Sequence, residues 1–204
     1  MSLTLARIGI ETPVTLAMER REIALDSVSD VELVSSEIGY LRIRQFIEKT
    51  DVELSAAVDH LIKEGATDLI IDLRSNPGGR LDAAARMAEL FLELDQTILK
   101  VESRRGVEET FQVLGTGVSY KLPTAVLIDG QSASASEIFA GALQDHERAI
   151  IVGETSFGKG SVQSVFGFSN GDGMKLTSAR YLLLKGAIVQ DVGVVPDIEV
   201  EMEA

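Results

Sequence analysis

The chain has 204 residues, 45% of them hydrophobic, which is enough to bury the core of one domain. Its formal net charge of −13 argues against nucleic acid or an anionic membrane surface as a partner, because phosphate groups are bound by clustered lysine and arginine. Since the chain contains no cysteine, disulfides, thiolate nucleophiles and thiolate metal sites are excluded.

The first third of the chain contains strand and helix patterns. Residues 13–28 alternate apolar and polar side chains, which predicts two short antiparallel strands. Residues 39–43 predict a further strand, and residues 51–65 predict a helix with one apolar face. His60 falls outside that face, so we expect it to be a solvated surface residue.

A buried strand at residues 67–73 leads into a glycine turn and then into a helical pattern at 81–92. The adjacent glycines Gly78 and Gly79 allow the backbone to approach a ligand closely and to aim N–H groups at it. A plain turn with Pro77-Gly78 as its corner explains the same residues, and the two interpretations stay open at this point.

The order of strand, turn and helix recurs later in the chain, after a predicted hairpin whose strands are residues 98–102 and 109–114. A strand at 124–128, a turn of small residues at 130–137 and a helix from Ile138 follow each other. Repeated units of this kind predict an α/β fold with its site at the strand ends.

The second turn contains three serines, Ser132, Ser134 and Ser136. A serine where a helix begins lies beside free N–H groups and the positive end of the helix dipole, so it suits a nucleophile. Ser134 and Glu137 also match a capping box, in which each satisfies the other's backbone donor. The two roles are compatible, and the pattern does not decide which serine would react.

A strand at 149–153 precedes a segment with Gly153, Gly158 and Lys159 at the spacing of a phosphate-binding P-loop. Three features argue against nucleotide binding: Gly160 replaces the hydroxyl residue, a strand-like alternation follows, and the chain is acidic. Lys159 has another use. In an apolar environment a lysine loses hydration, which favours the neutral form that serves as the base for a serine.

Histidine is the usual base, but His146 lies at the predicted end of the helix that Ser134 begins. At 1.5 Å rise per residue the two residues would be roughly 15–18 Å apart, which excludes a histidine triad. Lys159 remains the best base, and its alternative role is that of a surface lysine.

Four segments together resemble the C-terminal processing, or tail-specific, serine proteases. They are DLRSNPGG at 72–79, SASASEIFAGALQD at 132–145, VGETSFGKGSVQ at 152–163 and VGVVPDIEV at 192–200. The resemblance implies Ser134 as nucleophile, Lys159 as general base and Gln163, on the same strand face, as the residue that orients the lysine. It also implies an oxyanion hole formed by the Ala135 N–H and an N–H of Gly78 or Gly79, a supporting role for Asp145, and no metal or other cofactor.

The implied fold is a crotonase-like or Clp-protease-like α/β core of repeated strand-helix units at residues 29–204. Residues 1–28 would then be a leader followed by the last strands of a PDZ domain. The implied activity is endopeptidase cleavage near the C-terminus of proteins with an apolar tail, in the bacterial envelope or periplasm, with the oligomeric state, a homo-oligomer included, left open. A catalytically silent peptide-binding or scaffold module, and thioester chemistry on the same fold, are the alternatives.

Overall fold

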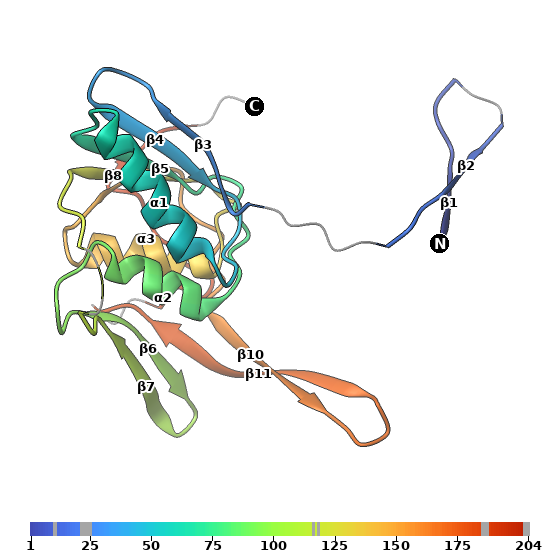
Figure 1. The fold of residues 1–204 in the computed structure, drawn as a ribbon. Coiled ribbons are helices and arrows are strands. Elements are labelled where there is room, and N and C mark those ends of the chain that lie inside the picture. The colour runs from blue at the N-terminus through green and yellow to red at the C-terminus, as the bar shows by residue number, and fades with distance from the viewer. Residues whose placement is uncertain (10–11, 21–25, 116, 118, 185–187, 202–204) are drawn as a thin grey trace.

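The structure is a computed structural model of the whole chain, and it describes every residue except 10–11, 21–25, 116, 118, 185–187 and 202–204. It is a mixed α/β fold, as the alternation of strand and helix patterns predicts (Figure 1). Among the described helices, none combines the length and the apolar character that are needed to cross a membrane.

A six-stranded sheet with the strand order β12-β9-β8-β5-β4-β3 forms one layer. Its strands are β3 (Val28–Leu33), β4 (Ile38–Ile43), β5 (Asp68–Asp72), β8 (Thr124–Ile128), β9 (Ile150–Gly153) and β12 (Ile198–Glu199). All neighbouring strands are parallel except β3 and β4. The carboxyl ends of β5 and β8 therefore lie next to each other, at the edge where parallel sheets place ligand sites.

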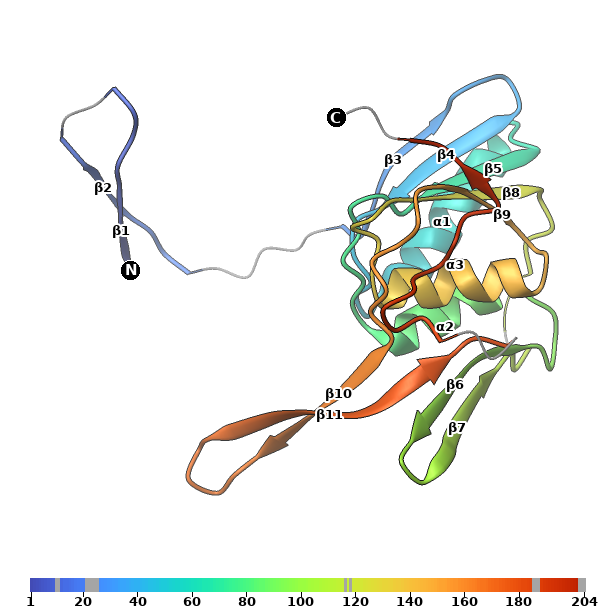
Figure 2. The same ribbon diagram turned by 180° about the vertical axis from the view of Figure 1, so that it is seen from behind.

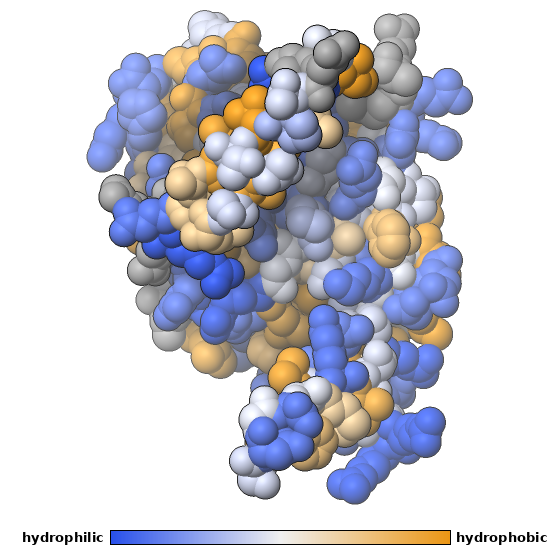
Figure 3. All heavy atoms as spheres, turned by 90° about the vertical axis from the view of Figure 1, so that its right-hand side faces the viewer, coloured by the Kyte–Doolittle hydropathy of each residue, from blue (hydrophilic) through white to orange (hydrophobic). Residues whose placement is uncertain are grey.

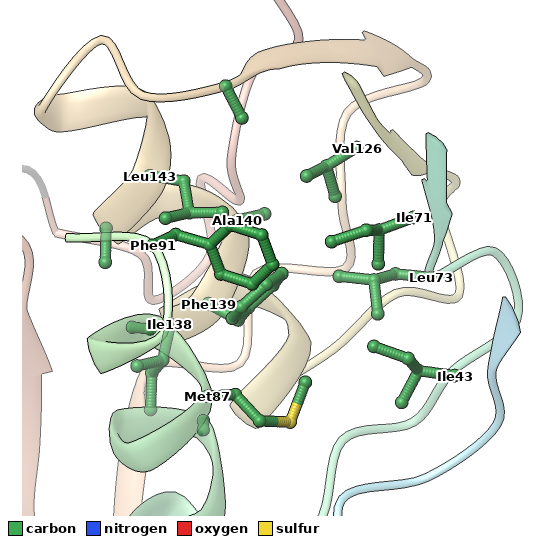
Figure 4. Packing of buried hydrophobic residues seen from close by; sticks show 14 of the residues in the cluster. Ile43, Ile71, Leu73, Met87, Phe91, Val126, Ile138, Phe139, Ala140 and Leu143 are labelled. Carbon is green, nitrogen blue, oxygen red and sulfur yellow. The ribbon is translucent and has the colours of Figure 1, made fainter. Parts of the chain in front are cut away.

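Three helices cover this sheet: α1 (Thr50–Lys63), α2 (Leu81–Glu89) and α3 (Ala135–Asp145). Helices α2 and α3 lie between the large sheet and a second sheet (Figures 1 and 2). Figure 4 shows the core, in which Phe91 and Phe139 lie among side chains from the strands and from both helices. The two rings pack edge to face with centroids 6.0 Å apart, an arrangement that aromatic pairs favour. This contact joins the end of α2 to the middle of α3.

The second sheet has the strand order β10-β11-β6-β7 and is antiparallel throughout. Its strands are β6 (Thr97–Ser103), β7 (Gly106–Gln112), β10 (Ser161–Gly167) and β11 (Gly173–Leu182). The β10–β11 hairpin projects from the body as an arm (Figures 1 and 2). Strand β10 begins directly after the loop that contains Lys159.

The N-terminal hairpin corrects the prediction for residues 13–28. Strand β2 (Val14–Ala17) lies in that range, but its antiparallel partner is the earlier strand β1 (Ser2–Leu5), and residues 21–25 fall outside the described part. Every residue of the two strands is exposed, and the hairpin lies apart from the body in Figures 1 and 2. Hydrophobic and hydrophilic surfaces are interspersed on the side where it projects (Figure 3).

Most other predicted elements are confirmed within one or two residues. Strand β8 has the predicted bounds, the helix predicted at 51–65 is α1, and the hairpin predicted at 98–114 is β6–β7. Strands β3, β11 and β12 were not predicted. Strand β11 is exposed along both faces for most of its length, so it lacks the alternation that signals a half-buried strand.

Candidate active site

The two strand-to-helix turns predicted from the sequence lie against each other at the carboxyl edge of the sheet. The turn after β5 holds Asn76, and the turn after β8 holds Ser134. The Ala133 N–H donates to the Asn76 carbonyl at 3.0 Å. The buried Asn76 side chain donates to the Ile43 carbonyl at 2.7 Å and accepts the Gly78 N–H at 2.9 Å. Asn76 therefore fixes one turn and supports the other.

Asp129, the residue after β8, stabilises the same junction with its carboxylate. It accepts the backbone N–H groups of Ser75 and Gln131, each at 2.9 Å, and of Ser132 at 3.0 Å. Burial acts to raise the pKa of this carboxyl group, but the hydrogen bonds from Ser75, Gln131 and Ser132 hold the pKa below its usual value. The charged form is thus the form that organises both turns.

The three serines of the second turn have different surroundings. The Ser132 hydroxyl is buried and donates to the Leu73 carbonyl at 2.8 Å. The Ser136 hydroxyl is buried and donates to the Asn76 carbonyl at 3.0 Å. Ser134 is half-buried and lines an open cavity of about 330 Å³. Of the three, Ser134 is the one whose hydroxyl a substrate can reach.

The backbone at Ser134 is unusual, with φ 59° and ψ −112°. Few residues other than glycine adopt such a conformation, and it costs of order 1–3 kcal/mol. Gly78 packs directly against this turn: a Cβ there would lie 2.4 Å from the Ala133 carbonyl oxygen and 2.8 Å from the Ala135 nitrogen. Only a glycine allows the two turns to approach so closely.

Glu137 lies beneath the site with 1% of its surface exposed. Its carboxylate accepts the backbone N–H of Ser134 at 2.6 Å, and the Ser134 side chain in turn faces the Glu137 backbone N–H, so the predicted capping box is confirmed. The same carboxylate accepts the N–H groups of Gly158 at 2.6 Å and Lys159 at 2.9 Å, and the Ser156 hydroxyl at 2.6 Å. It thereby joins the serine turn to the loop between β9 and β10.

Tyr181 of β11 adds a second link between these segments. Its hydroxyl donates to the Lys159 carbonyl, and it lies 3.2 Å from the Ser134 carbonyl. Burial raises the pKa of Tyr181 well above its ordinary range, and the neighbouring Glu137 carboxylate raises it further. The phenol is therefore a fixed donor.

Lys159 and Gln163 line the same cavity as Ser134, but two expectations about them were wrong. Lys159 is exposed, and so is the neighbouring Phe157, so the lysine is not desolvated here. Lys159 also precedes β10, and a β-bulge separates Val162 from Gln163, so the two residues do not share a regular strand face. Within the described residues, no hydrogen bond joins Ser134 to the Lys159 ammonium.

The predicted oxyanion donors differ in their availability. The Ala135 N–H, at the first position of α3, has no hydrogen-bond acceptor among the described residues, as is normal for a helix N-terminus. The Gly78 N–H already donates to Asn76, whereas Gly79 lines the cavity. Of the two glycines, Gly79 is therefore better placed than Gly78 to meet an oxyanion in the cavity.

Asp145 and His146 lie at the opposite end of α3 from Ser134. Asp145 is the last residue of the helix, so it lies roughly 15 Å from the serine. The His146 ring lies 2.7 Å from the Thr97 carbonyl of β6. The histidine is a contact between α3 and the second sheet, and His60 is exposed as expected.

The segment after β9 differs from a P-loop. A strand, β10, follows it where a P-loop is followed by a helix. The N–H groups of Gly158 and Lys159, which a phosphate would need, donate to Glu137. A negatively charged side chain of the protein already fills the place of the anion.

The sequence interpretation missed the contacts that Glu137 and Tyr181 make across the site. Glu137 was assigned to the capping box alone, and Tyr181 was not singled out. The available signal for Glu137 was its position inside a helix that packs on all sides, where an unpaired carboxylate would be costly. For Tyr181 the local sequence gives no signal, because its partners are 22 or more residues away.

A serine with a reachable hydroxyl, a lysine on the same cavity and an unpaired helix N–H are the parts of an acyl-transfer site. Residues 37–200 match the model of peptidase family S41. The chain therefore belongs to this family.

The chain is similar to the carboxy-terminal-processing protease of Bartonella bacilliformis, with 39% identity over 98% of this chain and 47% of that protein. It is similar to the carboxy-terminal processing protease CtpA of Bacillus subtilis, with 36% identity over 99% of this chain and 43% of that protein. Among solved structures, a photosystem II D1 C-terminal processing protease superposes with a TM-score of 0.79 at 29% identity, covering 93% of this chain and 52% of that one. The chain thus spans about half the length of these relatives.

Proposed function

We propose that this chain is the catalytic core of a serine endopeptidase that cleaves protein substrates near their C-terminus. The observation that carries the proposal is that Ser134, alone of the three serines, combines an accessible hydroxyl with a position on a cavity that also holds a lysine. Membership of family S41 and the names of its relatives support the same activity.

In the proposed mechanism, the Ser134 hydroxyl attacks the scissile carbonyl and gives its proton to a neutral Lys159. The lysine then returns the proton to the leaving amine, and water releases the acyl group from Ser134 by the reverse steps. The N–H groups of Ala135 and Gly79 hold the oxyanion, and each such donor contributes about 3 kcal/mol. Gln163 and Asp145 are proposed to support the site, Gln163 from the cavity and Asp145 through the structure of α3.

Substrate binding has a further part in this mechanism. Lys159 is exposed in the free chain, whereas a base must be neutral at the pH of the reaction. A polypeptide that covers the cavity would exclude water from the ammonium group, and removal from water favours the neutral form of a lysine. Substrate binding would thus favour the neutral lysine that acts as the general base.

The proposal extends to the fold family, the domain boundaries, the substrate and the location of the protein. The parallel sheet with α2 and α3 supports a crotonase-like or Clp-protease-like core at residues 29–204, with residues 1–28 as the remnant of a PDZ domain. The substrate is a protein with an apolar C-terminal tail, and the bacterial envelope or periplasm is the proposed location.

A second candidate function is a catalytically silent peptide-binding module. The lack of a hydrogen bond between the Lys159 ammonium and the Ser134 hydroxyl, within the part of the chain that the structure describes, favours it. Binding of a tail peptide without turnover, in a protein that contains the other half of its relatives' length, would establish this alternative.

The test is cleavage of an unstructured protein with an apolar C-terminal tail. The chain is compared with Ser134→Ala and with a matched control, Ser36→Ala, an exposed serine in the β3–β4 turn. We expect activity to be lost in Ser134→Ala and kept in Ser36→Ala. Equal cleavage by all three proteins would refute the proposed nucleophile.

A further inference from the structure

The cavity beside Ser134 is positively charged, although the chain as a whole is strongly negative. The charged side chains that line it are Lys159 and Lys175, and no carboxylate from the described residues lines it. The formal net charge of the chain is −13, so a cationic cavity runs against its average composition. A cleft lined by one sign of charge raises the local concentration of ligands of the opposite sign.

Two helix N-termini add to this charge. Leu81 is the first residue of α2, Ser134 directly precedes α3, and both line the cavity. Each helix N-terminus behaves as roughly half a positive charge, and its first N–H groups attract anions. The cavity is therefore surrounded by two ammonium groups and two positive helix ends.

Two acidic residues in the first turns of α2 and α3 are already engaged by other partners. Glu137 is buried beneath the cavity and accepts three backbone N–H groups and a serine hydroxyl. Asp82, in the first turn of α2, forms ion pairs with Arg80 at 2.9 Å and with Arg86 at 3.0 Å. Neither carboxylate neutralises Lys175.

Lys175 lies on the wall of the cavity that the β10–β11 arm provides. Its partner in the strand register is Val165, and the next pair on the same face toward the body is Gln163 with Thr177. Neighbouring pairs on one face are about 7 Å apart, so Lys175 lies a short distance along the arm from Gln163. Among the described residues Lys175 has no ion-pair partner, and its ammonium group is exposed.

We propose that Lys175 is a specificity-determining residue that binds a carboxylate of the substrate close to the scissile bond. The inference rests on the proposed peptidase function and refines its substrate class. Two sources supply such a carboxylate: the free C-terminus of the polypeptide, or an aspartate or glutamate side chain near the bond that is cleaved. Binding of the terminal carboxylate would place the cleaved bond a few residues from the end of the substrate.

The experiment compares two peptides with the same apolar sequence, one ending in a carboxylate and one in a carboxamide. A second pair, both amidated, carries glutamate or glutamine beside the scissile bond. The ratio of kcat/KM within each pair is measured for the chain, for Lys175→Gln and for Lys121→Gln. Lys121 is an exposed lysine that pairs with Glu93 outside this cavity, so it controls for loss of a charge.

We expect a preference of roughly 3- to 10-fold for the carboxylate in at least one pair, as charge-assisted contacts at a partly exposed site provide. The pair that shows it identifies the source. The preference should fall to near 1 in Lys175→Gln, persist in Lys121→Gln, and weaken at about 1 M salt, where charges are screened within about 3 Å. Equal kcat/KM in both pairs, or a preference that survives Lys175→Gln, would overturn the inference.

A peptide-binding measurement tests the carboxylate site independently of the proposed peptidase activity. Fluorescent versions of the peptides are titrated into Ser134→Ala, with and without Lys175→Gln. A carboxylate preference in binding that depends on Lys175, without any cleavage by the unmodified chain, would refute the peptidase and leave the carboxylate site standing. Equal binding of both members of each pair, or binding of none, would refute the site.

Discussion

Ser134 and Lys159 donate their backbone N–H groups to the same oxygen, Oε2 of Glu137, at 2.6 and 2.9 Å. The proposed nucleophile and base come from segments 25 residues apart, and one buried carboxylate holds both backbones. The distance between them is therefore set by Glu137 as much as by their own loops.

The first prediction concerns this carboxylate. In Glu137→Gln an amide NH₂ group would face backbone donors, so we expect the free energy of unfolding to fall by about 1.5–3 kcal/mol. Misplacement of the two loops should lower kcat by about 100-fold with little change in KM. Urea unfolding and steady-state kinetics provide the measurements.

Glu64→Gln is the matched control, since Glu64 is exposed at the end of α1. Glu137→Asp should recover part of the stability, because the charge is kept, but not the geometry. A Glu137→Gln protein with unchanged kcat would show that the carboxylate does not position the site.

The second prediction distinguishes the role of the Lys159 side chain from that of its backbone N–H. Lys159→Met removes the proposed base, while the N–H that Glu137 accepts is kept. We expect kcat/KM to fall by about 10²–10⁴-fold and the urea midpoint to stay the same, because the side chain is exposed. Lys63→Met, at the exposed end of α1, is the control, and full activity of Lys159→Met would refute the dyad.

The third prediction uses two glycines with similar backbone angles. Gly78 has φ 92° and Gly106 has φ 106°, so alanine is strained at both positions. Only at Gly78 would the new Cβ meet backbone atoms, since nothing lies within 4 Å at Gly106. Gly78→Ala should therefore cost about 2–3 kcal/mol more than Gly106→Ala, and it should abolish cleavage. Equal stability of the two variants would show that the Gly78 turn can move away from the Ser134 turn without cost.

The fourth prediction concerns the stability of the fold at low pH. The pKa of Asp82 is lowered to about 2 by Arg80, even though burial opposes this, and hydrogen bonds hold the pKa values of Asp72 and Asp129 below the usual value against burial. A carboxylate with a lowered pKa stabilises the fold above its unfolded pKa, and this contribution is lost as the pH falls. The free energy of unfolding should thus decrease from about pH 4 toward pH 2.

The pKa of Glu89 is raised by burial, so protonation of Glu89 stabilises the fold as the pH falls. This contribution makes the decrease in the free energy of unfolding smaller. Asp129→Asn should be less stable at neutral pH and show a shallower decrease. Urea unfolding at a series of pH values measures both effects, and stability that is constant down to pH 2 would contradict the prediction.

Sequence patterns predicted the four inner strands of the large sheet, β4, β5, β8 and β9, but not its edge strands β3 and β12, which are at most partly buried. The run at 124–128 is apolar and bounded by turn residues, and it matches β8 residue for residue. The β10–β11 arm was only half predicted, since Leu176 and Met174 are exposed and leave no clear alternation. The pattern at 13–28 led to the wrong strand partner because pairing depends on the turn between strands, which alternation does not specify.

Local sequence predicted the turns that lie together, whereas the catalytic roles of their residues stay predictions. The serine turn, the glycine turn and Lys159 are local features, and the structure brings all three to one cavity or its wall. The exposure of Lys159 and the contacts of Glu137 depend on how the loop after β9 folds back onto α3. Such contacts join residues 21 and 22 positions apart, so spacing along the chain could not predict them.

The N-terminal hairpin determines what an unfolding experiment on this chain measures. An isolated two-stranded hairpin is marginally stable in water, and every strand residue of β1 and β2 is exposed. It should open and close independently of the body, with rapid amide hydrogen exchange, whereas β5 and β8 exchange only when the body unfolds as a cooperative unit. The main transition in urea or heat therefore reports the α/β body and its site, and the hairpin adds only to the baseline.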